Sequence, residues 1–172
     1  MLSRSPVPVC SRAARLKAYA AAMSHAATIN AARESLLALH KALIDLLKAE
    51  RQRATGRALP PGELLQLLTT DPEWDWLHPY SQLIVSIDEL LESELPPTDD
   101  DAAAVRLEIE RLIDGREKRH TEAVDRDTNV ALEHGRLGAS LERLPGAELD
   151  EHPALLSRRN SWSEARRRRP RR

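Results

Sequence analysis

The chain has 172 residues, enough for one ordinary domain, and its 26 basic and 27 acidic residues give a formal net charge of −1. It contains no phenylalanine, three tryptophans and two tyrosines, so its core must be built from aliphatic side chains, which favours helices. One cysteine excludes an internal disulfide, and no apolar run reaches the roughly 20 residues of a membrane-spanning helix. Together with the lack of an apolar secretory segment near Met1, these features predict a cytoplasmic protein without membrane contact.

The near-zero net charge hides a strong segregation of charge along the chain. Residues 1–33 carry a formal charge of +5, residues 34–154 carry −13, and residues 155–172 carry +7. The periodic sequence lies in the acidic part, which indicates a folded body between two basic ends. We therefore predict three segments: a basic N-terminal arm at 1–27, a helical bundle domain at 28–145, and a disordered Arg-rich tail at 146–172.

The N-terminal arm has more than one interpretation. It is rich in Arg, Ser and Ala and has no acidic residue before Glu34, a composition that is also typical of a mitochondrial transit peptide. Periodic sequence begins shortly after Met23, so the arm can equally be disordered or lie upstream of a translation start at Met23. The composition favours the latter two interpretations and leaves targeting as an alternative.

The first predicted helix covers residues 30–55, with Asn30 as its N-cap and Gly56 at its end. A short helix follows at 61–68. Residues 70–73 have the order of a further helix start, a capping residue followed by proline and an acid, and Pro79 then predicts a break.

Three more segments complete the predicted domain. Leucines and isoleucines at helical spacing predict an amphipathic helix at 80–95. Thr98 and the three acids after it predict the start of a helix that runs to about Gly115. The very polar residues 116–127 fit an exposed helical extension or a loop, and a last helix runs from 127 or 128 to 144. The sequence thus predicts an all-α fold of four main helices plus one short helix in an antiparallel bundle.

Two histidines, His40 and His134, lie on the apolar stripes of the first and last predicted helices. If these helices are neighbours, the imidazoles can face each other in the core, where helical bundles hold metal ions or haem. The di-iron class of bundle needs two Glu-x-x-His motifs, and the chain has one copy, at 117–120. The sequence therefore favours histidines that hydrogen-bond to nearby protein groups, without a cofactor, and keeps a metal site at His40 and His134 as an alternative.

The only aromatic residues of the predicted domain are Trp74, Trp76 and Tyr80. Tryptophan and tyrosine are enriched among residues that anchor protein interfaces. Because residues two apart point to different sides of a helix, one tryptophan is expected in the core and the other near the surface. These three residues are the predicted interaction site.

The C-terminal tail is the candidate for nucleic-acid binding. A dense arginine run can bind phosphate groups, and this run contains Arg166, Arg167, Arg168 and Arg169. No basic recognition helix precedes the tail, and the adjoining body is acidic, so nucleic acid is the less favoured partner.

No catalytic motif is present in the sequence. The chain lacks a phosphate-binding P-loop, a dinucleotide fingerprint, a nucleophile elbow and the His-Glu-x-x-His zinc motif, so we predict that it is not an enzyme.

Residues 35–144 resemble a group of short, uncharacterised bacterial helical proteins. The residues that carry the resemblance are Leu39, His40, Lys41, Gly62, Glu63, Leu64, Leu65, Asp71, Pro72, Trp76, Leu77, Pro79, Ser81, Ile84 and Asp88, with a weaker extension to His134. The resemblance implies a helical bacterial protein and implies no activity, substrate or cofactor.

The leading functional prediction is a non-catalytic helical bundle that acts as a protein-interaction or regulatory module. Its partner is an unknown protein, with a homodimer as one option. The alternatives are a metal- or haem-binding bundle that uses the core histidines and a nucleic-acid-associated protein that uses the Arg-rich tail.

Overall fold

The computed structural model describes residues 12–114 and 117–146, with side chains from Met23 onward. These residues form six α-helices and one 3-10 turn, and none of them is in a β-strand, which confirms the predicted all-α class. No helix in the described part combines the length and apolar character needed to cross a membrane. Residues 1–11 and the predicted tail from 147 onward lie outside the described residues. The elements are α1 (Arg12–Thr55), α2 (Pro61–Thr70), η1 (Asp75–Leu77), α3 (His78–Leu91), α4 (Asp99–Ile113), α5 (Lys118–Arg126) and α6 (Thr128–Leu141).

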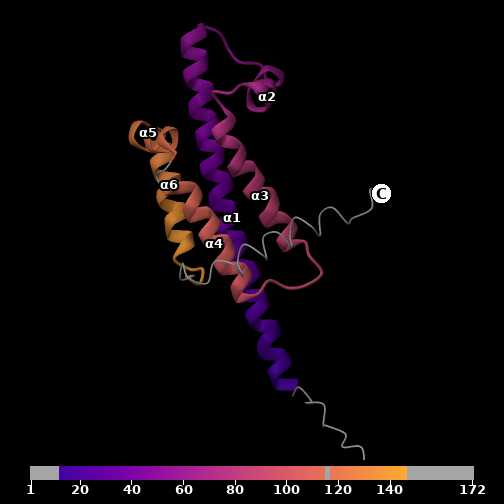
Figure 1. The fold of residues 1–172 in the computed structure, drawn as a ribbon. Coiled ribbons are helices and arrows are strands. Elements are labelled where there is room, and N and C mark those ends of the chain that lie inside the picture. Colours follow the sequence, from indigo (N-terminus) through magenta and orange to yellow (C-terminus); the bar gives the residue numbers. More distant parts are fainter. Residues whose placement is uncertain (1–11, 115–116, 147–172) are drawn as a thin grey trace, which may run out of the picture.

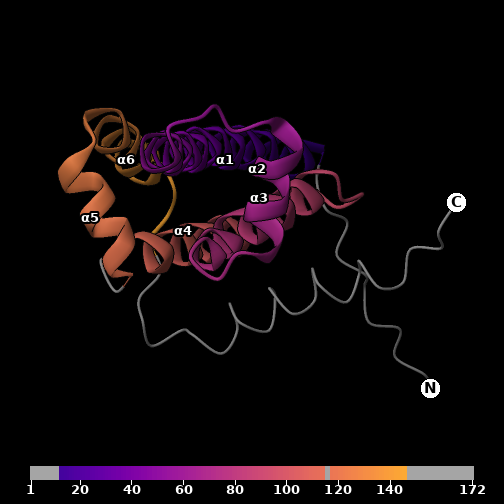
Figure 2. The same ribbon diagram turned by 90° about the horizontal axis from the view of Figure 1, so that it is seen from above.

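Helix α1 is the central element and packs against α6, α3 and α4 (Figure 1). Seen from above, α1 and α6 lie on one side of the molecule, and α3 and α4 lie on the other (Figure 2). The short helix α5 lies at one edge, between α4 and α6, and it packs on α6. This arrangement places η1 and α5 near the C-terminal half of α1.

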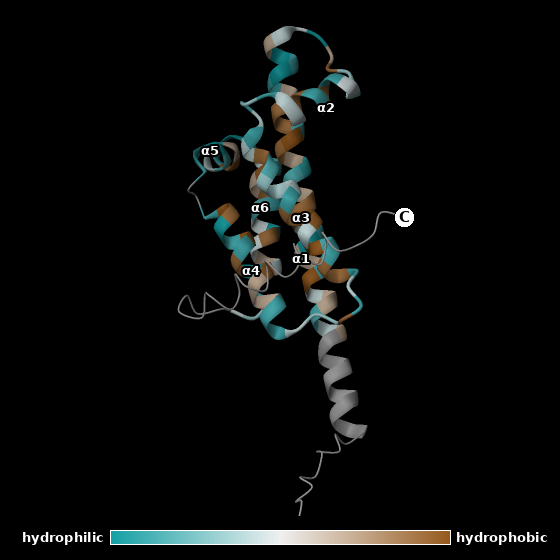
Figure 3. Cartoon of the chain, turned by 45° about the vertical axis from the view of Figure 1, so that its right-hand side comes forward, coloured by the Kyte–Doolittle hydropathy of each residue, from teal (hydrophilic) through white to brown (hydrophobic). Residues whose placement is uncertain are grey.

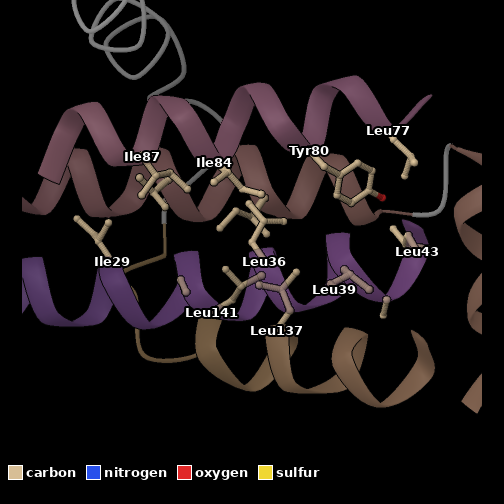
Figure 4. Close-up of a cluster of buried hydrophobic side chains, with 14 of the residues drawn as sticks. Ile29, Leu36, Leu39, Leu43, Leu77, Tyr80, Ile84, Ile87, Leu137 and Leu141 are labelled. Atoms are coloured by element: carbon tan, nitrogen blue, oxygen red, sulfur yellow. The ribbon is translucent and has the colours of Figure 1, made fainter. Parts of the chain in front are cut away.

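The core forms where the apolar faces of the long helices meet, because each face repeats at the three- to four-residue spacing of a helix. Apolar stretches of α1, α3, α4 and α6 gather between the helices, whereas α5 is mostly hydrophilic (Figure 3). Side chains from α3 face those of α1 and α6 across this core (Figure 4). Its largest fully buried aliphatic side chains are Ile29, Leu36, Leu39, Leu43, Leu77, Ile87, Ile109 and Leu137.

Several predicted helix boundaries are confirmed. Thr98 and Asp101 form a reciprocal capping box at the start of α4, in which each side chain accepts a hydrogen bond from the other residue's backbone N–H. The side chain of Asp127 caps α6. The chain changes from η1 to α3 at His78, next to Pro79, where the sequence predicts a break.

The predicted start of the first helix is wrong. Helix α1 begins at Arg12, so Asn30 lies inside it, and its side-chain amide donates to Glu34 one turn later, 3.0 Å away. Alanine-rich sequence has the highest helix propensity, so the residues before Asn30 continue the helix rather than end it. The helix therefore crosses the boundary expected between residues 27 and 28.

The polar residues 116–127 contain a helix that the predicted set of four main helices and one short helix does not include. Helix α5 follows Glu117, whose side chain accepts a hydrogen bond from the backbone of Arg119, and it buries His120 and Ala123. Residues 71–74 form a turn instead of the predicted helix start, with the Asp71 carboxylate accepting the backbone N–H of Glu73. Both differences lie at the same corner of the molecule.

Candidate functional site

The predicted aromatic cluster lies at the corner between α1, η1 and α5. Trp74 and Tyr80 are buried, with 4% and 1% of their surface exposed, whereas Trp76 is half-buried. The Trp76 ring meets Tyr80 edge-on, with centroids 6.1 Å apart. One tryptophan is thus in the core and the other is partly accessible, although Trp74 lies in the turn before η1 and not in the helix that the sequence predicts. Tyr80 is too deeply buried to contact a partner, and its role at this corner is to pack against Trp76.

A row of four rings runs through the core from α1 to α6. His40 stacks on Tyr80 with centroids 5.9 Å apart, Tyr80 stacks on His120 at 6.0 Å, and His120 lies 5.2 Å from His134. Each ring comes from a different helix, α1, α3, α5 and α6 in that order. The row therefore joins the short helix α5 to three long helices.

Hydrogen bonds link three of these rings. The Tyr80 hydroxyl lies 2.7 Å from His120 Nδ1, and His120 Nε2 lies 3.1 Å from His134 Nδ1. If Tyr80 donates to Nδ1, the His120 proton sits on Nε2 and is donated to His134, so every proton in the chain has an acceptor. The reverse direction leaves the buried hydroxyl proton of Tyr80 without one, so we assign the first arrangement.

Burial favours the neutral forms of His120 and Tyr80, the two side chains that share the shortest of these hydrogen bonds. Burial, with a smaller contribution from His134 and against the negative charge of Glu117, lowers the pKa of His120 from 6.5 to about 4. Burial also raises the pKa of Tyr80 well above its ordinary value, and Glu117 adds to the rise. Burial lowers the pKa of His40 in the same way. The chain is therefore a neutral polar network inside an apolar core.

The two histidines singled out by the sequence, His40 and His134, are connected through Tyr80 and His120 instead of facing each other. His134 already accepts a hydrogen bond from His120, and His40 Nε2 lies 3.4 Å from the Ser81 hydroxyl. Within residues 12–114 and 117–146, no three His, Cys, Asp or Glu side chains gather in a way that could hold a metal ion. The structure therefore adds no observation in favour of the metal-site alternative.

His120 is the site residue that the sequence did not single out. It lies in the most charged segment of the domain, and one helical turn separates it from Ala123, the other buried residue of α5. A two-residue apolar stripe is too short to reveal an amphipathic helix. The sequence shows His120 only as the end of the Glu-x-x-His motif at 117–120, which relates to metal binding and not to a buried contact with Tyr80.

A pocket of about 360 Å³ opens beside the aromatic cluster, and we call it the corner pocket. Its apolar lining comes from three parts of the chain, α1, the η1 corner and α5. These lining residues are Leu43, Leu46, Leu47, Ala54, Trp74, Trp76 and Ala123. The pocket size lies at the lower end of the range for ligand sites and suits one or two side chains.

Charged side chains form the rest of the pocket lining. Arg126 pairs with Glu50 at 3.7 Å, which ties α5 to α1. Arg119 donates to the backbone carbonyl of Glu73 at 2.7 Å, which ties α5 to the turn before η1. The two contacts hold α5 over the corner pocket.

Trp76 carries an unusual polar atom. Its indole Nε1 is buried and has no hydrogen-bond partner, and it is the only buried side-chain nitrogen or oxygen of the described residues in that state. Such a group costs about 1–3 kcal/mol when it is left unsatisfied. Trp76 also lines the corner pocket, but Nε1 itself is covered by protein atoms, so an acceptor in the pocket can reach this donor only if the indole turns.

The candidate nucleic-acid residues, Arg166 to Arg169, lie outside the described residues. No protein-family model, no curated protein and no solved structure matches this chain.

Proposed function

We propose that this protein is a non-catalytic interaction module that binds a protein partner at the corner pocket. The observation that carries the proposal is the half-buried Trp76 beside a preformed apolar pocket, with its indole N–H unsatisfied. Interface anchors are typically aromatic or aliphatic side chains seated in such pockets and surrounded by polar groups. The corner pocket has this composition, with an apolar interior and charged residues around it.

The packing of the corner supports binding in a preformed site. Trp74 is buried behind the pocket, and Trp76 rests edge-on against Tyr80, which is fixed by its contacts with His40 and His120. A site whose walls are already ordered loses little conformational entropy when it is filled. The buried ring row therefore acts as the support for the half-buried tryptophan.

A photo-crosslinking experiment tests the location of the binding site. Benzoylphenylalanine in place of Glu122, which is exposed and lines the pocket, should give a crosslinked protein partner in cells. The same group in place of Leu95, which is 79% exposed and follows the far end of α3, is the control and should not give that product.

A matched pair of substitutions makes the test specific. Ala54→Trp places a large ring on an exposed lining residue of the pocket, and Ala139→Trp places the same ring on the exposed face of α6. The first change should abolish the crosslink from position 122 and the second should preserve it. A crosslink that survives Ala54→Trp, or that forms equally from position 95, contradicts the proposal.

A further inference from the structure

We propose that the segment entering the corner pocket is an acidic peptide, in which an apolar side chain lies next to a carboxylate. This inference rests on the proposed function and adds the chemistry of the partner. It follows from the apolar interior of the pocket, the balance of charges around it and the missing acceptor at Trp76.

The apolar interior calls for an apolar side chain. Leu43, Leu46 and Leu47 line the pocket from successive turns of α1, and Trp74 and Ala123 lie on other sides of it. Filling such a space with a side chain of the size of leucine removes apolar surface from water on both partners. This burial favours binding in proportion to the apolar area that is removed from water.

Three carboxylates and three guanidinium groups line the pocket, and their existing ion pairs decide which charges remain available to an occupant. Glu50 is neutralised by Arg126, and Glu122 by Lys118 at 3.5 Å. Arg51 and Arg119 also line the pocket, and no carboxylate of the described residues lies within 4.0 Å of either guanidinium. One lining carboxylate, that of Glu73, likewise has no ion pair in the described part of the chain.

The charged lining groups without an ion pair among the described residues are therefore the guanidinium groups of Arg51 and Arg119 and the carboxylate of Glu73. Arginine binds carboxylates through paired, charge-assisted hydrogen bonds, which are about twice as strong as neutral ones. The pKa of Glu63 is lowered mainly by its hydrogen bonds with Arg57, and the charge of Arg51 adds a smaller part of the lowering. A carboxylate that enters the pocket is attracted by the positive charge of Arg51 in the same way.

The unsatisfied indole N–H favours an occupant that brings an acceptor. A lysine ammonium or an arginine guanidinium only donates hydrogen bonds, so these side chains cannot serve Nε1 and they meet two further positive charges. A carboxylate has four acceptor positions and can serve the indole and a guanidinium together. Because Nε1 is buried in the empty pocket, the indole must turn slightly toward the occupant to make this bond.

The acidic body explains why the carboxylate must be adjacent to the apolar anchor. Residues 34–154 carry a formal charge of −13, which repels an extended acidic surface. Screening limits that repulsion to about 8 Å at physiological ionic strength, whereas the contacts with Arg119 and Trp76 act at hydrogen-bond distance. A short segment with one well-placed carboxylate therefore binds better than a broadly acidic partner.

Blocked tetrapeptides of matched length test the inference on the full-length protein. Their central pair is leucine followed by aspartate, by asparagine or by lysine, and a fourth peptide has alanine followed by aspartate. Binding is measured from the NMR signal of the Trp76 indole N–H, which is assigned by its loss in Trp76→Phe. The leucine–aspartate peptide should bind best, the asparagine peptide about tenfold more weakly, and the lysine peptide should not shift the signal.

Substitutions in the protein provide the matched controls. Arg51→Gln and Arg119→Gln should each weaken the leucine–aspartate peptide several-fold and leave the asparagine peptide nearly unchanged. Glu73→Gln removes the opposing charge and should strengthen the leucine–aspartate peptide. Circular dichroism and thermal melting show whether each variant is folded, and Arg51→Gln remains informative if Arg119→Gln loosens α5.

The outcomes separate this inference from the proposed function. Equal affinity for the aspartate and asparagine peptides, or tighter binding of the lysine peptide, overturns the acidic class and leaves the corner pocket as a binding site. The same conclusion follows if none of the peptides binds while the crosslink from position 122 forms. Loss of that crosslink as well removes the proposed function itself.

Discussion

Protonation of His120 is expected to destabilise the fold, and acid titration of the native protein tests the ring row directly. His120 is 2% exposed, accepts a hydrogen bond from Tyr80 and donates one to His134. A proton on Nδ1 breaks the bond from Tyr80 and places a positive charge in the core beside His134. The negative charge of Glu117 favours the protonated form.

The size and direction of the effect follow from the pKa of His120. Folding lowers it from 6.5 to about 4, so the unfolded chain binds the proton more tightly. Stability from this group is fully present above pH 6.5 and is lost as the pH falls toward 4. The difference corresponds to about 3 kcal/mol in total, of which about 2 kcal/mol is lost by pH 5.

Urea denaturation between pH 7.5 and 5 measures this loss as a fall in the free energy of unfolding. In His120→Gln, whose amide does not titrate, the free energy should be lower at pH 7.5 but should depend much less on pH. A remaining slope is expected from His40, whose pKa is also lowered by burial.

A native free energy of unfolding that stays constant from pH 7.5 to 5 refutes this account of the ring row. An equally steep decline in His120→Gln refutes it as well, because the titrating group must then lie elsewhere.

Three further substitutions test separate parts of the structure by urea denaturation at pH 7.5. Tyr80→Phe leaves Nδ1 of His120 without its donor and should cost about 1–3 kcal/mol, and a neutral result means that the hydrogen bond does not form. Trp74→Ala empties a buried site and should cost about 3–5 kcal/mol, whereas a loss below 1 kcal/mol places Trp74 at the surface. Thr98→Ala removes the capping box of α4 and should cost about 1 kcal/mol, and Ser at the same position should restore most of it.

The sequence predicts those parts of the fold that depend on neighbouring residues. Thr98 with Asp101, Asp127 and Pro79 mark helix starts or breaks because a cap or a proline acts on the backbone within one turn. Asn30 shows the limit of this logic. It is a good capping residue, but the alanine-rich residues before it continue α1, and the burial of Ile29 and Ala32 holds that part of the helix against the core.

The candidate site is only partly visible in the sequence. One tryptophan ring is buried and the other is half-buried, as expected, but the helical spacing is not the reason, because Trp74 lies in the turn before η1 and Trp76 lies in η1. His40 and His134 are also recognised as lying on inward faces. Their connection through Tyr80 and His120 is not, since it depends on α5, a helix with only two buried residues and no recognisable periodicity.

The distribution of charge also separates what the sequence determines from what the tertiary structure determines. The sequence by itself determines an acidic helical body, aliphatic apart from a few rings, because charge and helix propensity are properties of residues and of short segments. Only the tertiary structure decides that Arg51, Arg119 and Arg126 gather at one pocket and that Tyr80 meets His120 in the core. Arg51 and Arg126, which line the same pocket, are 75 positions apart in the sequence, and long-range packing, not local preference, brings such residues together.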